Sequence, residues 1–300
     1  MKLIKSKYEI IFQEKGLEGM YKNIEKAGRL CYASDPVEGK AKDFVDKLMR
    51  SNHLSVLEHG TVYLKIDADI LVNNRNGWEE CYIGECYAGN KYSKRVLLDG
   101  YSYISTNLRV LVENDWLDDL QYLCEPTEYH IKRISVLFNA VSLGIAREIM
   151  RHRSFSFSQR STRYCNYNNW NKFGEHMEFI LPTWCNLPLG EYFEGDELTT
   201  WCPDNIDFDS LSCKERIFIS SLIEGEAKYH VLIHQKCKPQ EARDILPLAL
   251  NAPMMMTGFI DDWKHFFSLR ALGITGKPHP DCVVLTKPLM ETFKKLNLML

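Results

Sequence analysis

Helix-like and strand-like patterns follow one another along this sequence without a regular repeat, and that mixture constrains the fold most. At about 16–33 and 41–51, apolar residues recur every three or four positions, the period of one helix face. Near His53–Lys65 apolar residues alternate with others, which indicates a strand, and further strands are expected at Tyr101–Ser105 and Ile134–Phe138. Because βαβ regularity is missing, we expect an α+β fold, with a mixed or antiparallel sheet flanked by helices.

The second half of the chain is expected to be mainly helical. Helical patterns cover about 141–151, 212–235, 261–272 and 280–296, and a helix is also expected near 116–124. A short helix should begin at Pro239, because proline suits a first helical turn.

Two stretches are interpreted as insertions into a single domain that covers residues 1–300. Residues 70–130 are punctuated by asparagine and glycine, which favour turns. Residues 185–210 are acidic and are expected to be a solvated excursion, with carboxylates at Glu191, Glu194, Asp196, Glu197, Asp204, Asp207 and Asp209.

Charge and hydropathy exclude several classes of protein. Lys and Arg total 37 against 40 Asp and Glu, so no overall positive field attracts nucleic acid or an anionic membrane. The longest uncharged stretch, Ile245–Ile260, has 16 residues and contains Pro247 and Pro253, so no membrane span is expected. The first residues hold scattered charges and no apolar run, so we expect a cytoplasmic protein.

Cysteine and histidine spacing predicts no metal site. The ten cysteines include no C-x-x-C pair and are interpreted as small core residues. His230 and His234 share a helix face, but the glutamate of H-E-x-x-H is missing, so we expect no zinc there. Met254, Met255 and Met256 are interpreted as core packing.

The densest chemical signal is the segment 147–163, REIMRHRSFSFSQRSTR. It holds five arginines, no lysine and one acid, Glu148. Arginine forks onto phosphate or carboxylate oxygens, so one interpretation is a nucleotide-binding anion site, aided by several hydroxyl groups. The other is that these cations complement the dipole of a helix C-terminus.

The same segment resembles a known family. Arg151-His152-Arg153, followed after seven residues by Ser161, is similar to the RHR-x7-S signature of flavin-dependent thymidylate synthases, the ThyX family. Three further segments resemble that family in the same order, namely His53-Leu-Ser55-Val-Leu-Glu58-His59, Gln240-Glu-Ala-Arg243-Asp-Ile-Leu-Pro247 and Trp263-Lys-His265-Phe-Phe-Ser-Leu-Arg270.

The resemblance implies a reaction and its partners. It implies an FAD-dependent methyltransferase that converts dUMP to dTMP in dTMP biosynthesis, with NADPH and 5,10-methylenetetrahydrofolate as co-substrates. It also implies a homotetramer whose sites are shared between subunits. No Cys here is followed by His, so the unrelated thiolate-dependent synthases are disfavoured.

The resemblance also implies roles for individual residues. Arg270 would be catalytic, as a cation against the uracil edge. The implied FAD-binding residues are Ser55, Arg151, His152, Arg153, Gln159 and His265. The implied dUMP-binding residues are Glu148, Arg151, Gln159, Arg160, Ser161, Thr162, Arg163, Arg243 and Arg270. Ser161 is interpreted as a binding residue, because no base that could activate it can be named.

Some positions depart from the family pattern, and two other functions stay open. Glu148 and Gln159 replace a glutamine and a glutamate of many members, and Phe259 and Asp261 replace an Asn-x-Arg segment. A related enzyme that leaves a hydroxymethyl group on dUMP would need much the same residues. A nucleic-acid-binding protein could instead use the arginines and phenylalanines of 153–160.

Overall fold

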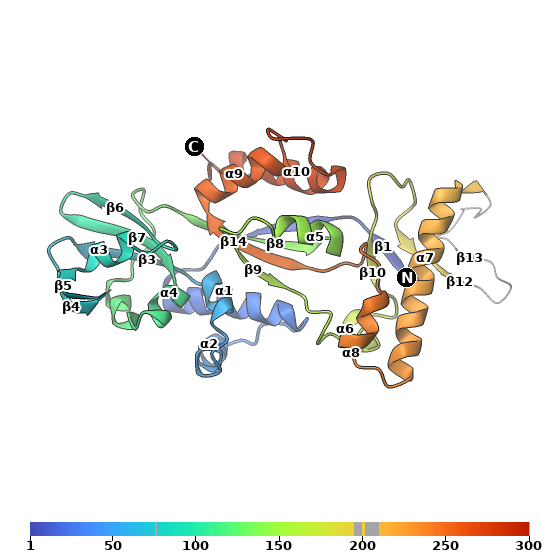
Figure 1. Cartoon of the computed structure of the whole chain (residues 1–300), viewed down its shortest axis with the longest axis horizontal. Coiled ribbons are helices and arrows are strands. Elements are labelled where there is room, and N and C mark those ends of the chain that lie inside the picture. The colour runs from blue at the N-terminus through green and yellow to red at the C-terminus, as the bar shows by residue number, and fades with distance from the viewer. Residues whose placement is uncertain (76, 195–199, 202–209, 300) are drawn as a thin grey trace.

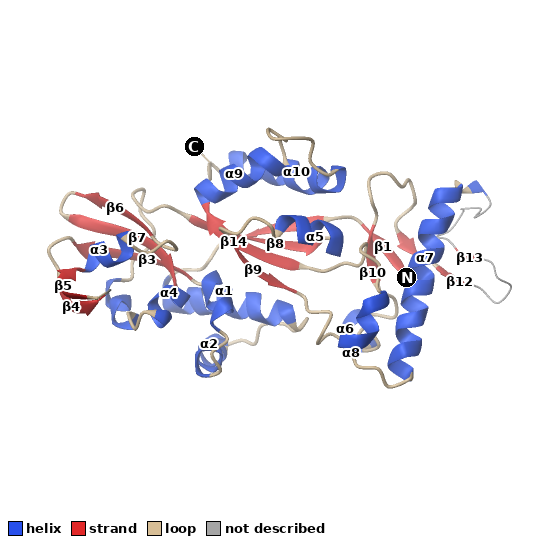
Figure 2. Ribbon diagram, in the orientation of Figure 1, coloured by secondary structure: helices blue, strands red, loops and turns tan. Residues whose placement is uncertain are grey.

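The computed structural model describes residues 1–75, 77–194, 200–201 and 210–299. The molecule is elongated, with helix α7 (Cys213–His234) near one end and a small sheet at the other (Figure 1). Helices and strands are both plentiful and interleave along the chain (Figure 2), which confirms the α+β class. In the described ranges no helix is both long and apolar enough to cross a membrane.

A four-stranded antiparallel sheet occupies the centre. Its strands lie in the order β2 (Lys7–Ile11), β8 (Arg133–Ala140), β14 (Met254–Phe259) and β9 (Ser156–Gln159). Every residue of β14 is buried, because elements packed on both sides of the sheet cover its two faces, so it shows no alternation that would have marked it as a strand. Strands β14 and β9 were not predicted from the sequence.

Helices cover both faces of this sheet. Since side chains alternate along a strand, Val136, Phe138 and Met256 pack with α9 (Ile260–Arg270) and α10 (Pro280–Lys295). Leu137 and Met255 face the other way, against Ala27 of α1 (Gly16–Cys31). In Figure 1, α9 and α10 lie above the sheet and α1 lies below it. Met254, Met255 and Met256 are all buried, which confirms their interpretation as core residues.

Most predicted helices form with small shifts of their ends. Helices α1, α7, α9 and α10 agree with the periodicity, as do α2 (Ala41–Arg50) and the shorter α5 (Leu143–Ile149) and α8 (Pro239–Ala242). Helix α7 begins with a capping contact, in which Glu215 accepts a hydrogen bond from the backbone N–H of Ser212 at 3.1 Å. A 3₁₀ helix, η2 (Leu117–Tyr122), replaces the α-helix expected near 116–124.

The strand expected at His53–Lys65 is only partly correct. Residues 54–59 form a 3₁₀ helix, η1 (Leu54–His59), and strand β3 (Thr61–Asp67) begins after Gly60. Burial alternates only from Leu64 onward, since Thr61 to Leu64 are all buried, and Leu57 and His59 are buried by a helical turn.

Residues 70–75 and 77–130 form ordered structure. Strand β3 pairs with β7 (Tyr101–Asn107), and β7 pairs with β6 (Lys94–Leu98) through a tight turn at Asp99 and Gly100, both with positive φ. Helices α3 (Ile83–Ala88) and α4 (Leu108–Glu113) and the hairpin of β4 (Leu71–Arg75) and β5 (Trp78–Tyr82) join this sheet. The segment shares a core with α1, α2 and β3, so its glycines and asparagines mark turns between packed elements.

A third core lies at the α7 end. There β1 (Lys2–Ile4) pairs with β10 (Glu178–Ile180) and β11 (Gly190–Glu191). Nearby are α6 (Trp170–Phe173), η4 (Arg243–Ile245), and the paired β12 (Phe193–Glu194) and β13 (Thr200–Trp201). Of the predicted acidic excursion, Asp196, Glu197, Asp204, Asp207 and Asp209 lie outside the described residues.

Candidate functional site

One cluster joins the end of α5 to the end of α9. Arg270 donates hydrogen bonds from Nε to Nε2 of His152 at 2.9 Å and from Nη1 to Oε2 of Glu148 at 3.1 Å. Its Nη2 donates to the backbone oxygen of Glu148 at 2.9 Å. His265 lies beside them, with its ring 6.4 Å from that of His152. We call these four residues the His–Arg cluster; all were predicted site residues.

The environment keeps His152 neutral. Burial, the charge of Arg270 and His265 lower the pKa of His152 to about 4. The hydrogen bond from Arg270 also requires a lone pair on Nε2, which places the imidazole proton on Nδ1. The cluster therefore carries the guanidinium cation and the Glu148 carboxylate around an uncharged imidazole.

A second cluster forms where β9 ends and η4 begins. Arg243 donates from Nη1 to Oγ1 of Thr162 at 3.4 Å, and Arg163 donates from Nε to Oε1 of Gln240 at 3.0 Å. In the described part of the chain, neither arginine forms an ion pair, and Arg243 does not pair with Glu241 or Asp244. We call residues 161–163 with Arg243 the serine–arginine turn; it presents two exposed cations with neutral partners.

Backbone contacts hold this turn in place. The N–H of Ser161 donates to the carbonyl of Cys31 at 2.9 Å, at the end of α1. The N–H of Arg163 donates to Oγ of Ser161 at 3.2 Å. In the described part of the chain the partner of this hydroxyl is a donor, so no base accepts its proton. The geometry is that of a positioned hydroxyl rather than an activated nucleophile.

Gln159 and Arg160 lie just before the turn and are partly buried. Gln159 donates to the carbonyl of Ala252 at 3.4 Å. The guanidinium carbon of Arg160 lies 5.7 Å from the ring centroid of Phe173, and its buried Nε has no hydrogen-bond partner. Gln159 and Arg160 thus stand between strand β14 and α6, close in sequence to the turn.

A cavity of about 870 Å³ adjoins the serine–arginine turn. It is bounded by the end of α1, by α2 and by η1, and Ser55, His53, Cys31 and Tyr32 line it. Tyr32 packs against Tyr164 with 5.5 Å between ring centroids, which connects this cavity to the turn. The predicted FAD-binding residue Ser55 therefore lies in an open site next to the predicted nucleotide-binding turn.

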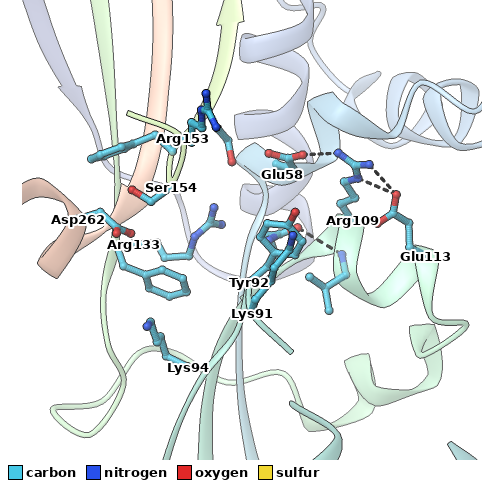
Figure 3. A pocket seen from close by; sticks show the side chains of 15 residues that line it. Glu58, Lys91, Tyr92, Lys94, Arg109, Glu113, Arg133, Arg153, Ser154 and Asp262 are labelled. Carbon is cyan, nitrogen blue, oxygen red and sulfur yellow. Dashed lines mark hydrogen bonds and ion pairs between the residues drawn. The ribbon is translucent and has the colours of Figure 1, made fainter. Parts of the chain in front are cut away.

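Arg153 lines a second, smaller cavity of about 490 Å³ (Figure 3). Arg153 and Ser154 lie on one side of it, and Lys91 and Tyr92 on the other. Arg109 and Glu113 border both cavities. Arg109 forms ion pairs with Glu113 and with Glu58, which lines only the smaller cavity, so Arg109 and Glu113 lie between the two spaces.

The predicted residues are therefore gathered in three places of one chain. These are the His–Arg cluster, the serine–arginine turn beside the larger cavity, and the smaller cavity at Arg153. Arg151 is exposed and lines neither cavity, although its sequence neighbours belong to the site.

Several residues at these cavities were not assigned a role from the sequence. Lys91, Lys94 and Arg109 come from the 70–130 segment, for which no function was expected. Arg133 is the first residue of β8 and is buried. Its burial could not be predicted from the sequence, because charged residues at the ends of strands are often exposed. A basic residue placed before an apolar run was the only available signal.

His230 and His234, which share a face of α7, lie outside these clusters. His230 forms a hydrogen bond with Asn168, and His234 is exposed. In the described ranges no group of three or more His, Cys, Asp or Glu side chains could hold a metal ion. Four of the described cysteines are buried and Cys213 is exposed, so the core interpretation of the cysteines holds only for some.

A family model described as thymidylate synthase complementing protein matches residues 16–75 and 129–296. A flavin-dependent thymidylate synthase of Corynebacterium efficiens is 29% identical over 138 residues, covering 46% of this chain and 49% of that protein. A probable flavin-dependent thymidylate synthase of Paramecium bursaria Chlorella virus 1 is 28% identical over 147 residues, covering 47% and 58%. The chain thus spans about half the length of these curated relatives.

Among solved structures, a UMP/dUMP methylase from Streptomyces cacaoi aligns with 99% of this chain and 93% of its own. The TM-score is 0.43 at 16% sequence identity.

Proposed function

Because the chain belongs to the thymidylate synthase complementing protein family, we propose that it is a flavin-dependent thymidylate synthase. The reaction is the reductive methylation of dUMP to dTMP, with 5,10-methylenetetrahydrofolate as carbon donor and NADPH as reductant through FAD. The relatives that match over about half of their length carry that name, one of them as probable. The observation that carries the proposal is the serine–arginine turn beside the larger cavity.

The turn suits the phosphate of a nucleotide. Arg163 and Arg243 come from segments 80 residues apart in sequence, yet each contacts a neutral side chain of the other's segment: Arg163 donates to Gln240, and Arg243 donates to Thr162. Guanidinium groups bind phosphate oxygens in a fork, and the hydroxyls of Ser161 and Thr162 supply further donors. We assign dUMP binding to these four residues, with Gln159 and Arg160 beside them.

Arg270 is assigned the catalytic role against the uracil ring. A guanidinium has five N–H donors, and three of them are used on His152 and Glu148. Two remain for a substrate oxygen, where a cation would stabilise negative charge that develops on the ring. His152 and Glu148 hold the guanidinium in one orientation, so no reorganisation is needed when substrate binds.

The residues around the two cavities fit a phosphate-bearing flavin. Ser55 lines one cavity and Arg153 the other, and the smaller one is also lined by the buried Arg133, whose Nε has no hydrogen-bond partner. We assign FAD binding to Ser55, Arg151, His152, Arg153, Gln159 and His265. When bound, reduced FAD supplies the reducing equivalents, so a protein nucleophile is not required.

We further propose that the protein is a homotetramer with sites shared between subunits. Its folate partner is the co-substrate that carries the transferred carbon. The separation of the three groups of site residues within one chain supports sharing, since a second chain could bring Arg151 to a neighbour's turn. The cytoplasmic location expected from the sequence stays a prediction.

The decisive experiment is mass spectrometry of the nucleotide after anaerobic incubation with FAD, NADPH, methylenetetrahydrofolate and dUMP. Gain of one methyl group supports the proposal. A hydroxymethyl product would keep the flavin and folate assignments but change the reaction. Unmodified dUMP in the presence of bound flavin would contradict it, and salt-sensitive nucleic-acid binding without flavin would favour the remaining alternative.

A further inference from the structure

The smaller cavity contains a buried arginine without a carboxylate partner. Arg133 is 9% exposed and lines this cavity. Its Nε has no hydrogen-bond partner, and its Nη1 reaches Oγ1 of Thr61 and the carbonyl of Thr106 only at 3.4 and 3.5 Å. No ion pair to Arg133 is found in the part of the chain that the structure describes. A buried charge without a counter-charge is costly, so an anion is expected nearby.

The remaining charges of the cavity do not neutralise it. Its lining holds five cationic side chains, namely Lys91, Lys94, Arg109, Arg133 and Arg153, and three acidic ones, namely Glu58, Glu113 and Asp262. Arg109 forms ion pairs with both glutamates. With five cationic and three acidic side chains, the lining carries a net surplus of two positive charges. Both glutamates are held by Arg109, so Asp262 is the carboxylate of the lining that is left for the other four cations.

An aromatic ring stands between two of these cations. The guanidinium carbon of Arg133 lies 5.4 Å from the ring centroid of Phe259, and Nζ of Lys94 lies 5.8 Å from the same centroid. Such contacts let cations stay near one another without an intervening carboxylate. Phe259 is one of the positions at which this chain departs from the family pattern, and here it supports both cations.

The cationic side chains converge from distant parts of the chain. Lys91 and Lys94 precede and begin β6, Arg133 begins β8, and Arg153 follows α5 (Figure 3). The lysines fall within residues 76–128, the stretch that the family model leaves unmatched. The inserted segment thus completes a positively charged cavity that its neighbours in the fold begin.

We propose that Lys91, Lys94 and Arg133 form an anion subsite in this cavity for the phosphate groups of a dinucleotide. A volume of about 490 Å³ is within the range of small-molecule sites, and several converging cations suit a pyrophosphate better than a single carboxylate. The ligand is the pyrophosphate of FAD or the phosphates of NADPH. That choice of ligand rests on the proposed function, whereas the anion subsite does not.

The test uses the full chain and measures binding rather than turnover. The probe is inorganic pyrophosphate, titrated by calorimetry at constant ionic strength into the wild type and into the double variant Lys91→Ala/Lys94→Ala. Both lysines are exposed, so the variant should fold. We expect Kd for pyrophosphate to rise by about tenfold or more, as for loss of charge-assisted contacts. Lys132→Ala, an exposed lysine next to Arg133 but outside the cavity, is the matched control and should bind as the wild type does.

Two further titrations identify the source of the phosphate. If FAD occupies the subsite, the double variant loses affinity for FAD but keeps its affinity for riboflavin, which has no phosphate. If NADPH occupies it, affinity for NADPH falls while FAD binding is unchanged. Arg133→Gln should lose affinity for the same phosphate-bearing ligand as the double variant does. If Arg133→Gln does not fold, Arg133→Lys is used in its place and should keep part of the wild-type affinity.

The inference is overturned when pyrophosphate, FAD and NADPH all bind the double variant within twofold of the wild type. It is also overturned when Lys132→Ala weakens binding equally, because the effect would then be one of general surface charge. Weakened pyrophosphate binding in a chain that forms no dTMP would retain the subsite and reject the proposed function. If the chain forms dTMP but the double variant binds pyrophosphate, FAD and NADPH as the wild type does, the proposed function is retained and the subsite is rejected.

Discussion

Arg270 and His152, 118 residues apart in sequence, are joined by a 2.9 Å hydrogen bond in which the guanidinium donates to the imidazole. The bond requires that His152 be neutral, in agreement with its lowered pKa. A histidine in the middle of an arginine-rich motif thus acts as an acceptor that orients a cation, rather than as a further positive charge.

Replacing Arg270 with alanine should reduce dTMP formation by about 100-fold or more, because a preorganised donor to the developing charge is removed. FAD binding, followed by flavin fluorescence, should survive. Lys264→Ala, an exposed residue on the same helix, should change neither. Equal loss of flavin binding and methylation would contradict the catalytic assignment.

Replacing Ser161 with alanine should weaken dUMP binding by roughly 1 kcal/mol, about fivefold in Kd, since one neutral hydrogen bond is lost. Equilibrium dialysis with dUMP measures the change. Ser221→Ala, exposed on α7, is the control and should have no effect. Complete inactivity with unchanged dUMP affinity would instead assign Ser161 a nucleophilic role.

Acid should destabilise the fold through His59. Its Nδ1 is 2.8 Å from Oγ1 of Thr257, its Nε2 has no partner, and burial with the nearby charge of Arg133 lowers its pKa to about 3. Between pH 6.5 and 3 the unfolded chain binds a proton that the folded chain excludes. Stability from this residue is therefore present above pH 6.5 and falls as the pH is lowered, by about 2 kcal/mol at pH 5.

Urea unfolding at pH 7.5 and pH 5 measures this loss. The variant His59→Gln should lose less stability between the two pH values than the wild type, although it starts from a lower value. His234→Gln, at an exposed position, should retain the full dependence. An unchanged pH dependence in His59→Gln would assign the acid sensitivity to other groups.

Sharing of sites between subunits predicts complementation. Arg151→Ala and Arg163→Ala should each abolish dTMP formation, since both are assigned to dUMP. Co-expressed, they should regain up to about a quarter of wild-type activity, because some sites then receive both intact arginines from different subunits. Mixed tetramers without any recovered activity would place both arginines at a site within one chain.

The long helices could be predicted from the sequence because each has one buried face. Strand β14 could not, since Met254–Phe259 are buried on both faces and show no period. The strand expected at 53–65 was partly wrong because its first half buries Leu57 and His59 through a 3₁₀ turn. In each case the sequence did not show which distant segments would pack against these residues.

The candidate site was predictable only as an ordered set of motifs. The meeting of Arg243 with Thr162 agrees with their joint assignment to dUMP. The contact between Arg270 and Glu148 spans 122 residues and leaves no local pattern. Lys91 and Lys94 lie in a segment whose turns are visible in the sequence, but their approach to Phe259 and Arg133 is not.

The central sheet also bears on how the chain acquires its structure. Strand β6 pairs with β7 through a two-residue turn. Strand β8 instead pairs with β2 and β14, and each pairing joins residues more than 100 positions apart in sequence. Lys7 lies opposite Ala140, and Phe138 lies opposite Met254. Pairings that close long loops are slow to form. During refolding, hydrogen exchange should therefore protect the β6–β7 hairpin first, and dUMP binding should appear only with the final kinetic phase, when β14 joins β8.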